Sequence, residues 1–228
     1  MSAAWLAALG DALVSVLFPA HCPACGAYVK VRGDWCTPCL SRTVRPHCLA
    51  LAPAALAVLD GAWALGSYGG ALGTLIRDLK YRKRRGAAVP MQAALAAASL
   101  PKEIVSADLA VCVPLHEARE QERGFNQTQL FFAPWLKAQG IAQAAVLVRR
   151  RATAPQYGLG EKERAENVRG AFALAAAGRG GAMPIAGRRL LLLDDILTTG
   201  ATLTSCAAVL KKAGAASVYA LVLASDHS

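Results

Sequence analysis

The feature that most constrains this chain is a run of four leucines followed directly by two aspartates and a short stretch of small hydroxylated residues, at positions 190–202. Four consecutive apolar residues bounded by polar ones are typical of a buried strand in a parallel sheet. Such a strand delivers the residues that follow it to the carboxyl edge of the sheet, where α/β proteins bind ligands. The pattern predicts an α/β fold with a ligand site directly after residue 193.

Two kinds of group follow this strand, and each suits one half of a phosphorylated sugar. Asp194 and Asp195 can accept hydrogen bonds from vicinal hydroxyls such as those of a ribose. Small residues and closely spaced N–H groups at the start of a helix then form a cradle for a phosphate monoester. The cradle residues are Thr198, Thr199, Gly200, Ala201 and Thr202. We therefore expect a ribose 5-phosphate ligand.

Two other nucleotide sites could place an acidic residue after a strand. A Walker-B strand, whose acid holds Mg²⁺, requires a G-x-x-x-x-G-K-[ST] phosphate loop, and the chain has none. A dinucleotide site requires G-x-G-x-x-G after a strand, which is also absent. The sugar-phosphate interpretation is favoured.

Four of the seven cysteines form two C-x-x-C steps near the N-terminus. Each step presents two thiolates from a tight turn, and two steps supply the four soft ligands that tetrahedral Zn²⁺ prefers. Because four thiolates leave no open coordination position, the expected zinc is structural. The alternative of disulfides or free thiols stays open, although nothing in the sequence indicates an oxidising compartment. The expected metal ligands are Cys22, Cys25, Cys36 and Cys39.

Other thiols and imidazoles lie near these steps or farther along the chain. The sequence does not decide whether His21, His47 or Cys48 replaces one of the four ligands. Cys112 and Cys206 lie in apolar segments and are expected to be core residues.

The chain has 228 residues, of which 55% are hydrophobic and 18% charged. These proportions exclude disordered, collagen-like and coiled-coil proteins and allow one α/β domain with a small appendage. We expect an amphipathic helix at 1–20, a zinc-knuckle domain at 21–50 and the α/β domain at 60–226. The first segment lacks the basic start of a secretion signal, and no apolar run reaches about 20 residues, so we expect a cytoplasmic protein without a membrane span.

Alternating strands and helices are expected after the cysteines. The predicted strands are 61–68, 109–113, 144–148, 190–193 and 218–223. The predicted helices are 71–80, 87–99, one that ends near 139 with Gly140 as its C-cap, and one that ends at Gly214. A polar loop is expected at 116–127, and the long polar segment 149–170 is a candidate mobile active-site loop.

A net charge of +10 favours anionic partners, either phosphorylated small molecules or nucleic acid. A basic cluster with one tyrosine ends the predicted helix 71–80. It could be a solvated helix end that complements the helix dipole, or a contact for phosphate or nucleic acid, and the sequence leaves both open. The cluster comprises Lys80, Tyr81, Arg82, Lys83, Arg84 and Arg85.

Taken together, these motifs resemble the ComF family, which includes competence proteins and GntX-type amidophosphoribosyltransferase-like proteins. The segment 194–202 resembles the phosphoribosyl pyrophosphate motif of type I phosphoribosyltransferases. The resemblance extends from about residue 19 over nearly the whole chain. It is carried, in order, by the two C-x-x-C steps, Leu79-Lys80-Tyr81, Val113-Pro114-Leu115, Arg123-Gly124-Phe125-Asn126-Gln127, Gln156, Arg164, Asn167 and 194–202. Many relatives carry a further C-x-x-C-G step where this chain has only His47-Cys48, so the resemblance gives no support for a second zinc.

The resemblance implies a type I phosphoribosyltransferase-like domain that binds phosphoribosyl pyrophosphate with Mg²⁺. A catalytic member would transfer the phosphoribosyl group to an acceptor that the sequence does not identify. The expected contacts of the pyrophosphate, including a loop that closes over it, are Pro114, Leu115, Arg119, Arg123, Arg149, Arg150, Arg151 and Arg164.

The competence branch of the family implies a second hypothesis, a non-catalytic adaptor that handles single-stranded DNA together with DNA-uptake proteins. The excess positive charge and the basic cluster favour it. The aromatic content of 6% is low for a surface on which bases stack.

Overall fold

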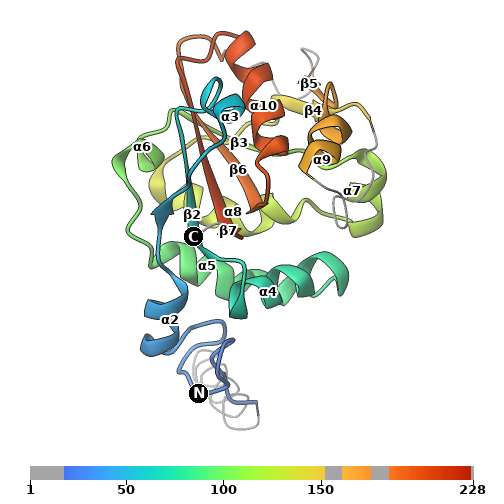
Figure 1. The fold of residues 1–228 in the computed structure, drawn as a ribbon. Helices are drawn as coiled ribbons and strands as arrows, with labels where there is room; N and C mark the ends of the chain where they lie inside the picture. The colour runs from blue at the N-terminus through green and yellow to red at the C-terminus, as the bar shows by residue number, and fades with distance from the viewer. Residues whose placement is uncertain (1–17, 152–160, 176–184, 227–228) are drawn as a thin grey trace, which may run out of the picture.

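The computed structural model describes residues 18–151, 161–175 and 185–226, and they form an α/β fold (Figure 1). The main sheet has the strand order β1-β2-β7-β6-β3. Strands β2, β7, β6 and β3 are parallel, whereas β1 pairs antiparallel with β2. The strands are β1 (His47–Cys48), β2 (Gly61–Ser67), β3 (Leu109–Cys112), β6 (Arg189–Leu197) and β7 (Ser217–Ser225). The predicted fold class, a mostly parallel sheet flanked by helices, is confirmed.

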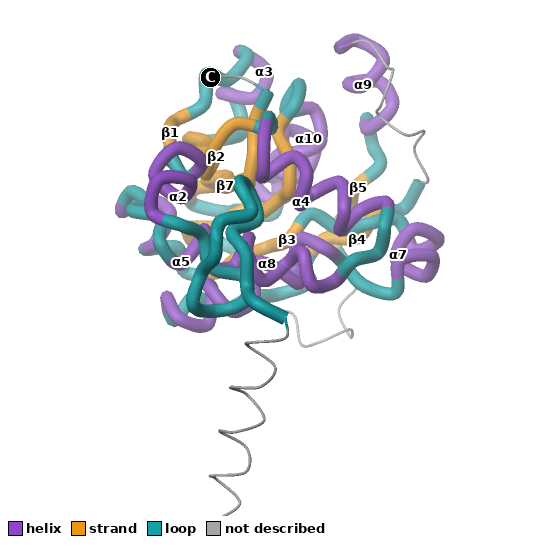
Figure 2. Tube along the Cα trace, turned by 90° about the horizontal axis from the view of Figure 1, so that it is seen from below, coloured by secondary structure: helices purple, strands orange, loops and turns teal. Residues whose placement is uncertain are grey.

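Helices cover both faces of this sheet. Helices α4, α5 and α8 lie on the face seen from below in Figure 2, and α10 lies on the opposite face with the short α3. The helices are α2 (Thr37–Thr43), α3 (Pro53–Leu56), α4 (Gly70–Tyr81), α5 (Ala88–Ala96), α6 (Lys102–Val105), α7 (Glu117–Arg123), α8 (Gln127–Gln139), α9 (Glu161–Val168) and α10 (Ala201–Lys212), with a short 3₁₀ turn η1 (Arg85–Ala87). In the part of the chain described, no helix has the length and apolar character that crossing a membrane requires.

The leucines of β6 explain why this strand is apolar on both sides. Leu191 and Leu193 pack into the core formed with α4, α5 and α8, whereas Leu190 and Leu192 pack into the core formed with α10. All four are fully buried. A strand sandwiched between two helical layers has no polar face, which is the reason for the uninterrupted run.

Strand β6 is longer than predicted, and its extra length creates a step in the sheet. It pairs with β7 as far as Leu197, which lies opposite Ser225. Its other neighbour, β3, ends at Cys112 opposite Leu193. Asp194 and the residues after it therefore have a strand on one side only, and the edge toward β3 is open.

Two sequence predictions between residues 116 and 149 differ from the structure. The expected polar loop contains helix α7, which the ring of His116 caps at its start and Gly124, with φ of 74°, ends. The expected strand 144–148 is displaced: β4 (Leu147–Arg149) pairs with β5 (Phe172–Leu174) in a separate two-stranded sheet. Helix α7 depends on the local groups that cap its ends, and β4 depends on a partner strand that is distant in the sequence. Neither dependence produces hydrophobic periodicity in the sequence.

Most of the remaining secondary-structure predictions fall on described residues and can be compared with the structure. Helices α4, α5, α8 and α10 and strands β2, β3 and β7 lie where they are expected, and Gly140 ends α8 with φ of 69°. Most of the predicted N-terminal helix falls at 1–17, outside the described residues, as does 152–160 within the predicted mobile loop. Within that segment, residues 161–168 form helix α9, so the segment is not a loop throughout. Its mobility stays a prediction.

The N-terminal segment packs onto the main core. Val29, Trp35 and Cys39 belong to the cluster of buried residues shared with α4 and α5. The indole Nε1 of Trp35 donates to the carbonyl of Pro90 over 2.8 Å.

Candidate functional site

A cleft of about 370 Å³ lies at the carboxyl end of the sheet, where β6 extends past β3. Residues at the end of β6, the turn after it and the start of α10 form one wall. The loop after β3, helix α7 and the end of α4 form the other. Of the residues predicted for ribose, phosphate and pyrophosphate, the cleft is lined by Asp194, Asp195, Thr198, Gly200, Ala201, Thr202, Pro114, Leu115, Arg119, Arg123 and Arg149.

Four predicted residues of these sets need separate mention. Thr199, Arg150 and Arg151 are described but do not line the cleft. The guanidinium of Arg151 donates instead to the carbonyls of Asn167 and Arg169, at 3.0 and 3.2 Å. Arg164 lies on α9, and its side chain is outside the described part of the chain.

Asp195 is buried, with 4% of its surface exposed, and both of its carboxylate oxygens accept hydrogen bonds. The ammonium of Lys80 donates to Oδ1 over 2.8 Å, and Nε2 of Gln127 donates to Oδ2 over 3.0 Å. Arg123 in turn donates to Oε1 of Gln127 over 2.8 Å. These partners satisfy a charge that would otherwise be costly to bury.

Asp194 has a different environment from its neighbour. It is partly exposed, and its Oδ1 accepts from the backbone N–H of Asp195 over 2.8 Å. Loss of solvent and, next, the charge of Asp195 raise the pKa of Asp194 to about 7, although Lys80 and Arg149 act in the opposite direction. Its protonation therefore changes near neutral pH.

The start of α10 has the features of an anion site. Gly200 precedes the helix with φ of 75°, a conformation that favours glycine. Helix α10 has twelve residues, and the first N–H groups of such a helix have no partner within the helix and carry the positive end of the helix dipole. Thr198 and Thr202 line the cleft beside it, so the predicted phosphate cradle faces the same space as the carboxylates.

Cations also line the cleft, among them Arg119 and Arg149. Loss of solvent lowers the pKa of Arg149, and the nearby charge of Arg119 lowers it further. The guanidinium of Arg149 also lies over the ring of Phe172, 5.3 Å from its centre. An anion bound near Arg119 and Arg149 would relieve their mutual repulsion.

The predicted basic cluster is divided by the structure. Lys80 and Tyr81 line the cleft. The others have partners outside it: Arg82 and Arg84 pair with Asp78 at 2.8 and 3.5 Å, Lys83 donates to the carbonyl of Glu122 over 2.7 Å, and Arg85 lies over the ring of Phe125, 4.7 Å from its centre.

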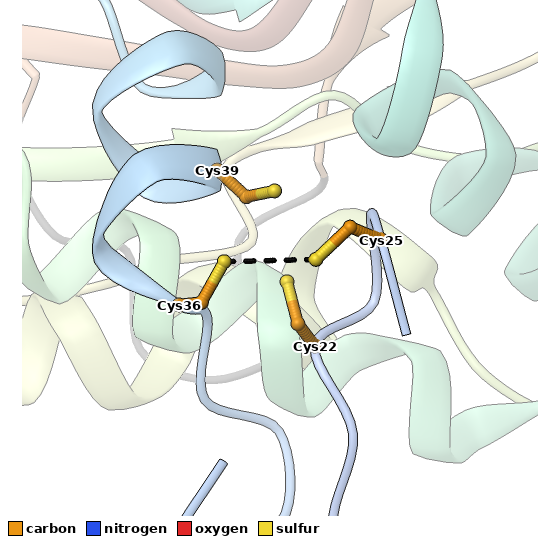
Figure 3. A group of neighbouring side chains, drawn as sticks. All are labelled: Cys22, Cys25, Cys36 and Cys39. Carbon is orange, nitrogen blue, oxygen red and sulfur yellow. Dashed lines mark hydrogen bonds between the residues drawn. The ribbon is translucent and has the colours of Figure 1, made fainter. Parts of the chain in front are cut away.

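The two C-x-x-C steps meet in one cluster, shown in Figure 3. The four sulfurs lie within 4.8 Å of one another, and Sγ of Cys25 is 3.7 Å from Sγ of Cys36. Two sulfurs bound to one tetrahedral zinc, each at about 2.3 Å, lie about 3.8 Å apart, so the arrangement fits zinc. Burial alone raises the pKa of Cys22, but hydrogen bonds from backbone N–H groups outweigh it and lower the pKa to about 6, which favours the thiolate there. At Cys36 a backbone N–H acts to lower the pKa, but hydrogen bonds with the other three thiols and loss of solvent raise it to about 12.

The sequence leaves open whether nearby residues take part in this cluster, and the structure answers the question. Among the described residues, the metal-binding group consists of the four cysteines and does not include His21, His47 or Cys48. His47 and Cys48 belong to β1, and Nδ1 of His47 lies 2.9 Å from the carbonyl oxygen of Arg45. The cluster can bind a metal such as zinc.

Some cleft residues have no role in the sequence prediction. Gln127, Tyr68 and Asp226 line the cleft, and Lys80 is predicted only as a member of the basic cluster, at a solvated helix end or in contact with phosphate or nucleic acid. Of these, Gln127 and Lys80 have a sequence signal, because the segments 123–127 and 79–81 carry the family resemblance. The ion pair between Lys80 and Asp195 joins residues 115 positions apart and leaves no local pattern.

The fold and the cleft define an α/β protein with a polar cleft at the carboxyl edge of a mostly parallel sheet. The chain is 34% identical over 167 residues to the DNA utilization protein YhgH of Escherichia coli (strain K12), covering 68% of this chain and 67% of that protein. It is 30% identical to YhgH of Salmonella typhimurium, with 86% of each protein covered, and 28% identical to competence protein F of Haemophilus influenzae, with 86% and 80% covered. The chain belongs to the family of YhgH and competence protein F, the ComF family.

Two further comparisons complete this picture. No family model matches the chain. Among solved structures, the glutamine phosphoribosylpyrophosphate amidotransferase of B. subtilis, complexed with ADP and GMP, is 20% identical with a TM-score of 0.35. That match covers 63% of this chain and 26% of the amidotransferase, so the chain spans about a quarter of the length of that protein.

Proposed function

We propose that the cleft binds phosphoribosyl pyrophosphate together with Mg²⁺. The observation that carries this proposal is that a carboxylate pair, a helix N-terminus and two arginines line one cleft. Carboxylates accept from vicinal hydroxyls, helix N-termini bind phosphate, and guanidinium groups bind pyrophosphate. A ribose with a phosphate at one end and a pyrophosphate at the other matches all three.

The residues at the end of β6 also fit Mg²⁺. This cation is commonly held by one or two carboxylates and by substrate phosphates rather than by a closed protein cage. In this cleft the pyrophosphate oxygens of the ligand would hold it, near the carboxylates at the end of β6. When bound, Mg²⁺ would neutralise part of the charge of the pyrophosphate.

If the protein transfers the phosphoribosyl group, a nucleophile forms a bond to C1 of the ribose as the bond from C1 to pyrophosphate breaks. The protein then has to orient the ribose, stabilise the departing charge and exclude water. The start of α10 would hold the 5-phosphate, and Arg119 and Arg149 would stabilise the pyrophosphate as it leaves.

Calorimetric titration of the zinc-loaded protein with phosphoribosyl pyrophosphate tests this proposal. We expect saturable binding that strengthens when Mg²⁺ is added and is lost in Asp194→Asn/Asp195→Asn. Asp34→Asn/Glu103→Gln removes the same charge from two exposed carboxylates outside the cleft and is the matched control. An unaltered titration in the first double variant, or no binding by the wild type, would overturn the proposal.

A second function, handling of single-stranded DNA, is favoured by the names of the relatives and by the exposed basic cluster beside the cleft. Tyr81 is 70% exposed at the cleft rim, and Arg82 and Arg84 are exposed next to it. An aromatic ring among cations is the combination that single strands use for stacking and phosphate contact.

Fluorescence anisotropy with a labelled oligonucleotide over a range of salt concentrations tests the DNA function. If the cluster binds DNA, Arg82→Ala/Arg84→Ala weakens binding and reduces the slope of log affinity against log salt by about 1 to 2. Lys30→Ala/Arg32→Ala removes the same charge from exposed residues near the cysteines. Equal effects of the two double variants would indicate general electrostatic attraction instead of a site.

A further inference from the structure

The two adjacent aspartates of β6 are not equivalent. Asp195 is buried, and protein donors occupy both of its oxygens: Lys80 from the end of α4 and Gln127 from the start of α8. Asp194 is more exposed and lines the cleft between α10 and Arg149. A ligand can reach Asp194 without breaking a hydrogen bond between side chains, whereas it would have to displace Lys80 or Gln127 from Asp195.

The strand geometry accounts for this difference. Successive side chains of a strand point to opposite faces of the sheet. Asp195 follows the alternation of Leu191 and Leu193 toward α4 and α8, and Asp194 follows Leu190 and Leu192 toward α10. The phosphate cradle is at the start of α10, so Asp194 is the carboxylate on the cradle side.

We propose that Asp194 alone meets the ligand hydroxyls, whereas Asp195 is a positioning residue that holds the ammonium of Lys80 in the cleft beside Asp194. This assignment rests on the proposed function, because it names which residues of that site touch the sugar. Lys80 thereby belongs to the cleft machinery rather than to the exposed basic cluster.

The electrostatic surroundings support this division. The charged and titratable groups around Asp194 are Asp195 on its own strand, Lys80 on α4, Arg149 on β4, Cys112 on β3 and Cys206 on α10. Asp195 disfavours ionisation of Asp194, and Lys80 and Arg149 favour it. Burial by itself lowers the pKa of Lys80, but the charge of Asp195 and the hydrogen bond with it raise the pKa above its usual value, so Lys80 stays charged.

The first test needs no ligand. The side-chain carboxyl carbons of aspartate are followed by NMR against pH in the wild type, Lys80→Met and Lys80→Arg. We expect the titration midpoint of Asp194 to rise by about one pH unit in Lys80→Met and to stay near the wild-type value in Lys80→Arg. A midpoint that is unchanged in Lys80→Met would overturn the assignment of Lys80.

The second test compares affinities for phosphoribosyl pyrophosphate with Mg²⁺. We expect Asp194→Asn to abolish measurable binding, and Asp195→Asn and Lys80→Met each to weaken it about tenfold. The double variant Lys80→Met/Asp195→Asn should be no weaker than the worse single variant, because the two residues act through each other. Lys80→Arg should restore affinity to within about threefold of the wild type.

The outcomes separate this assignment from the proposed function. Asp195→Asn could lose binding as completely as Asp194→Asn, and the losses of affinity from Lys80→Met and Asp195→Asn could multiply in the double variant. Together these results would show that Asp195 touches the ligand. If the wild type does not bind phosphoribosyl pyrophosphate, the proposed function fails, and the ligand-free titration still decides whether Lys80 controls Asp194. Near-ultraviolet circular dichroism of each variant verifies that it is folded.

Discussion

Gln127 donates from Nε2 to Oδ2 of Asp195 over 3.0 Å, and this bond ties the first residue of α8 to the end of β6. Arg123 fixes the orientation of the same amide by donating to its oxygen. Helix α7, which carries Arg119 and Arg123, is thereby held beside the carboxylates of the cleft.

Replacing Gln127 by leucine removes a donor from a buried carboxylate. Gln127 is only 4% exposed, so water cannot take its place without a change in packing. We expect Gln127→Leu to lower the free energy of unfolding by about 1–3 kcal/mol. Urea unfolding measures it, with Gln129→Leu on the exposed side of the same helix as the control. Equal losses in both variants would contradict the role given to this bond.

Alanine at position 200 imposes strain without a collision. Gly200 has φ of 75°, and a Cβ there would meet nothing nearer than a Leu197 methyl at 4.0 Å. The conformation costs other residues about 1–2 kcal/mol. We expect Gly200→Ala to lower stability by that amount and to weaken phosphate binding.

The matched control for this strain is Gly69→Ala. Gly69 also precedes a helix, but its φ is −65° and a Cβ would have open space. Thermal unfolding should therefore show little change in Gly69→Ala. If both alanine variants lose a similar amount of stability, the loss comes from reduced flexibility at the start of the helix and not from the left-handed conformation.

The pH dependence of stability should report on Asp194. Its pKa is raised from 3.8 to about 7, so between these values the folded chain binds a proton that the unfolded chain has lost. The contribution of Asp194 to stability is therefore favourable at low pH and is lost as the pH rises to about 7. Relative to the wild type, Asp194→Asn should therefore gain stability as the pH rises from about 4 to about 7.

Urea unfolding of the wild type and Asp194→Asn at several pH values measures this difference. The exposed Asp34 provides a control, because Asp34→Asn removes the same charge near the cysteines. If the free energies of unfolding of the wild type and Asp194→Asn change in parallel with pH, Asp194 has the same pKa in the folded and unfolded chains, which would contradict this prediction.

Loss of one cysteine of the cluster should remove the metal. We expect purified wild type to contain one zinc per chain and Cys36→Ser to contain none, as measured by elemental analysis. With free zinc about 100-fold above its dissociation constant, the bound metal stabilises the fold by about 2.7 kcal/mol, which the variant loses. Cys48→Ser, outside the cluster, should retain both zinc and stability. A wild type that purifies without zinc and takes up none would contradict the assignment.

Much of this fold is readable from local patterns. The four leucines predict β6, the spacing of Leu72, Leu75, Ile76 and Leu79 predicts α4, and the C-x-x-C steps predict the cysteine cluster. Each signal comes from residues close together in the chain, because a strand, an amphipathic helix and a metal-binding turn impose their own periods. Helix α7 has no such signal, since six of its seven residues are polar and it depends on His116 and Gly124 to begin and end it.

By itself, the sequence determined the α/β class, the edge of the sheet that carries the ligand groups and the four sulfurs that can bind a metal. Only the tertiary structure decided that Lys80 reaches Asp195 rather than solvent, that Gln127 joins them and that Asp194 is left facing the phosphate cradle. The physical reason is that a charged side chain pairs with a group that lies near it in the folded protein, whatever their separation along the chain. Hydrogen bonds between residues 68 and 115 positions apart exist only after the sheet and its helices have packed.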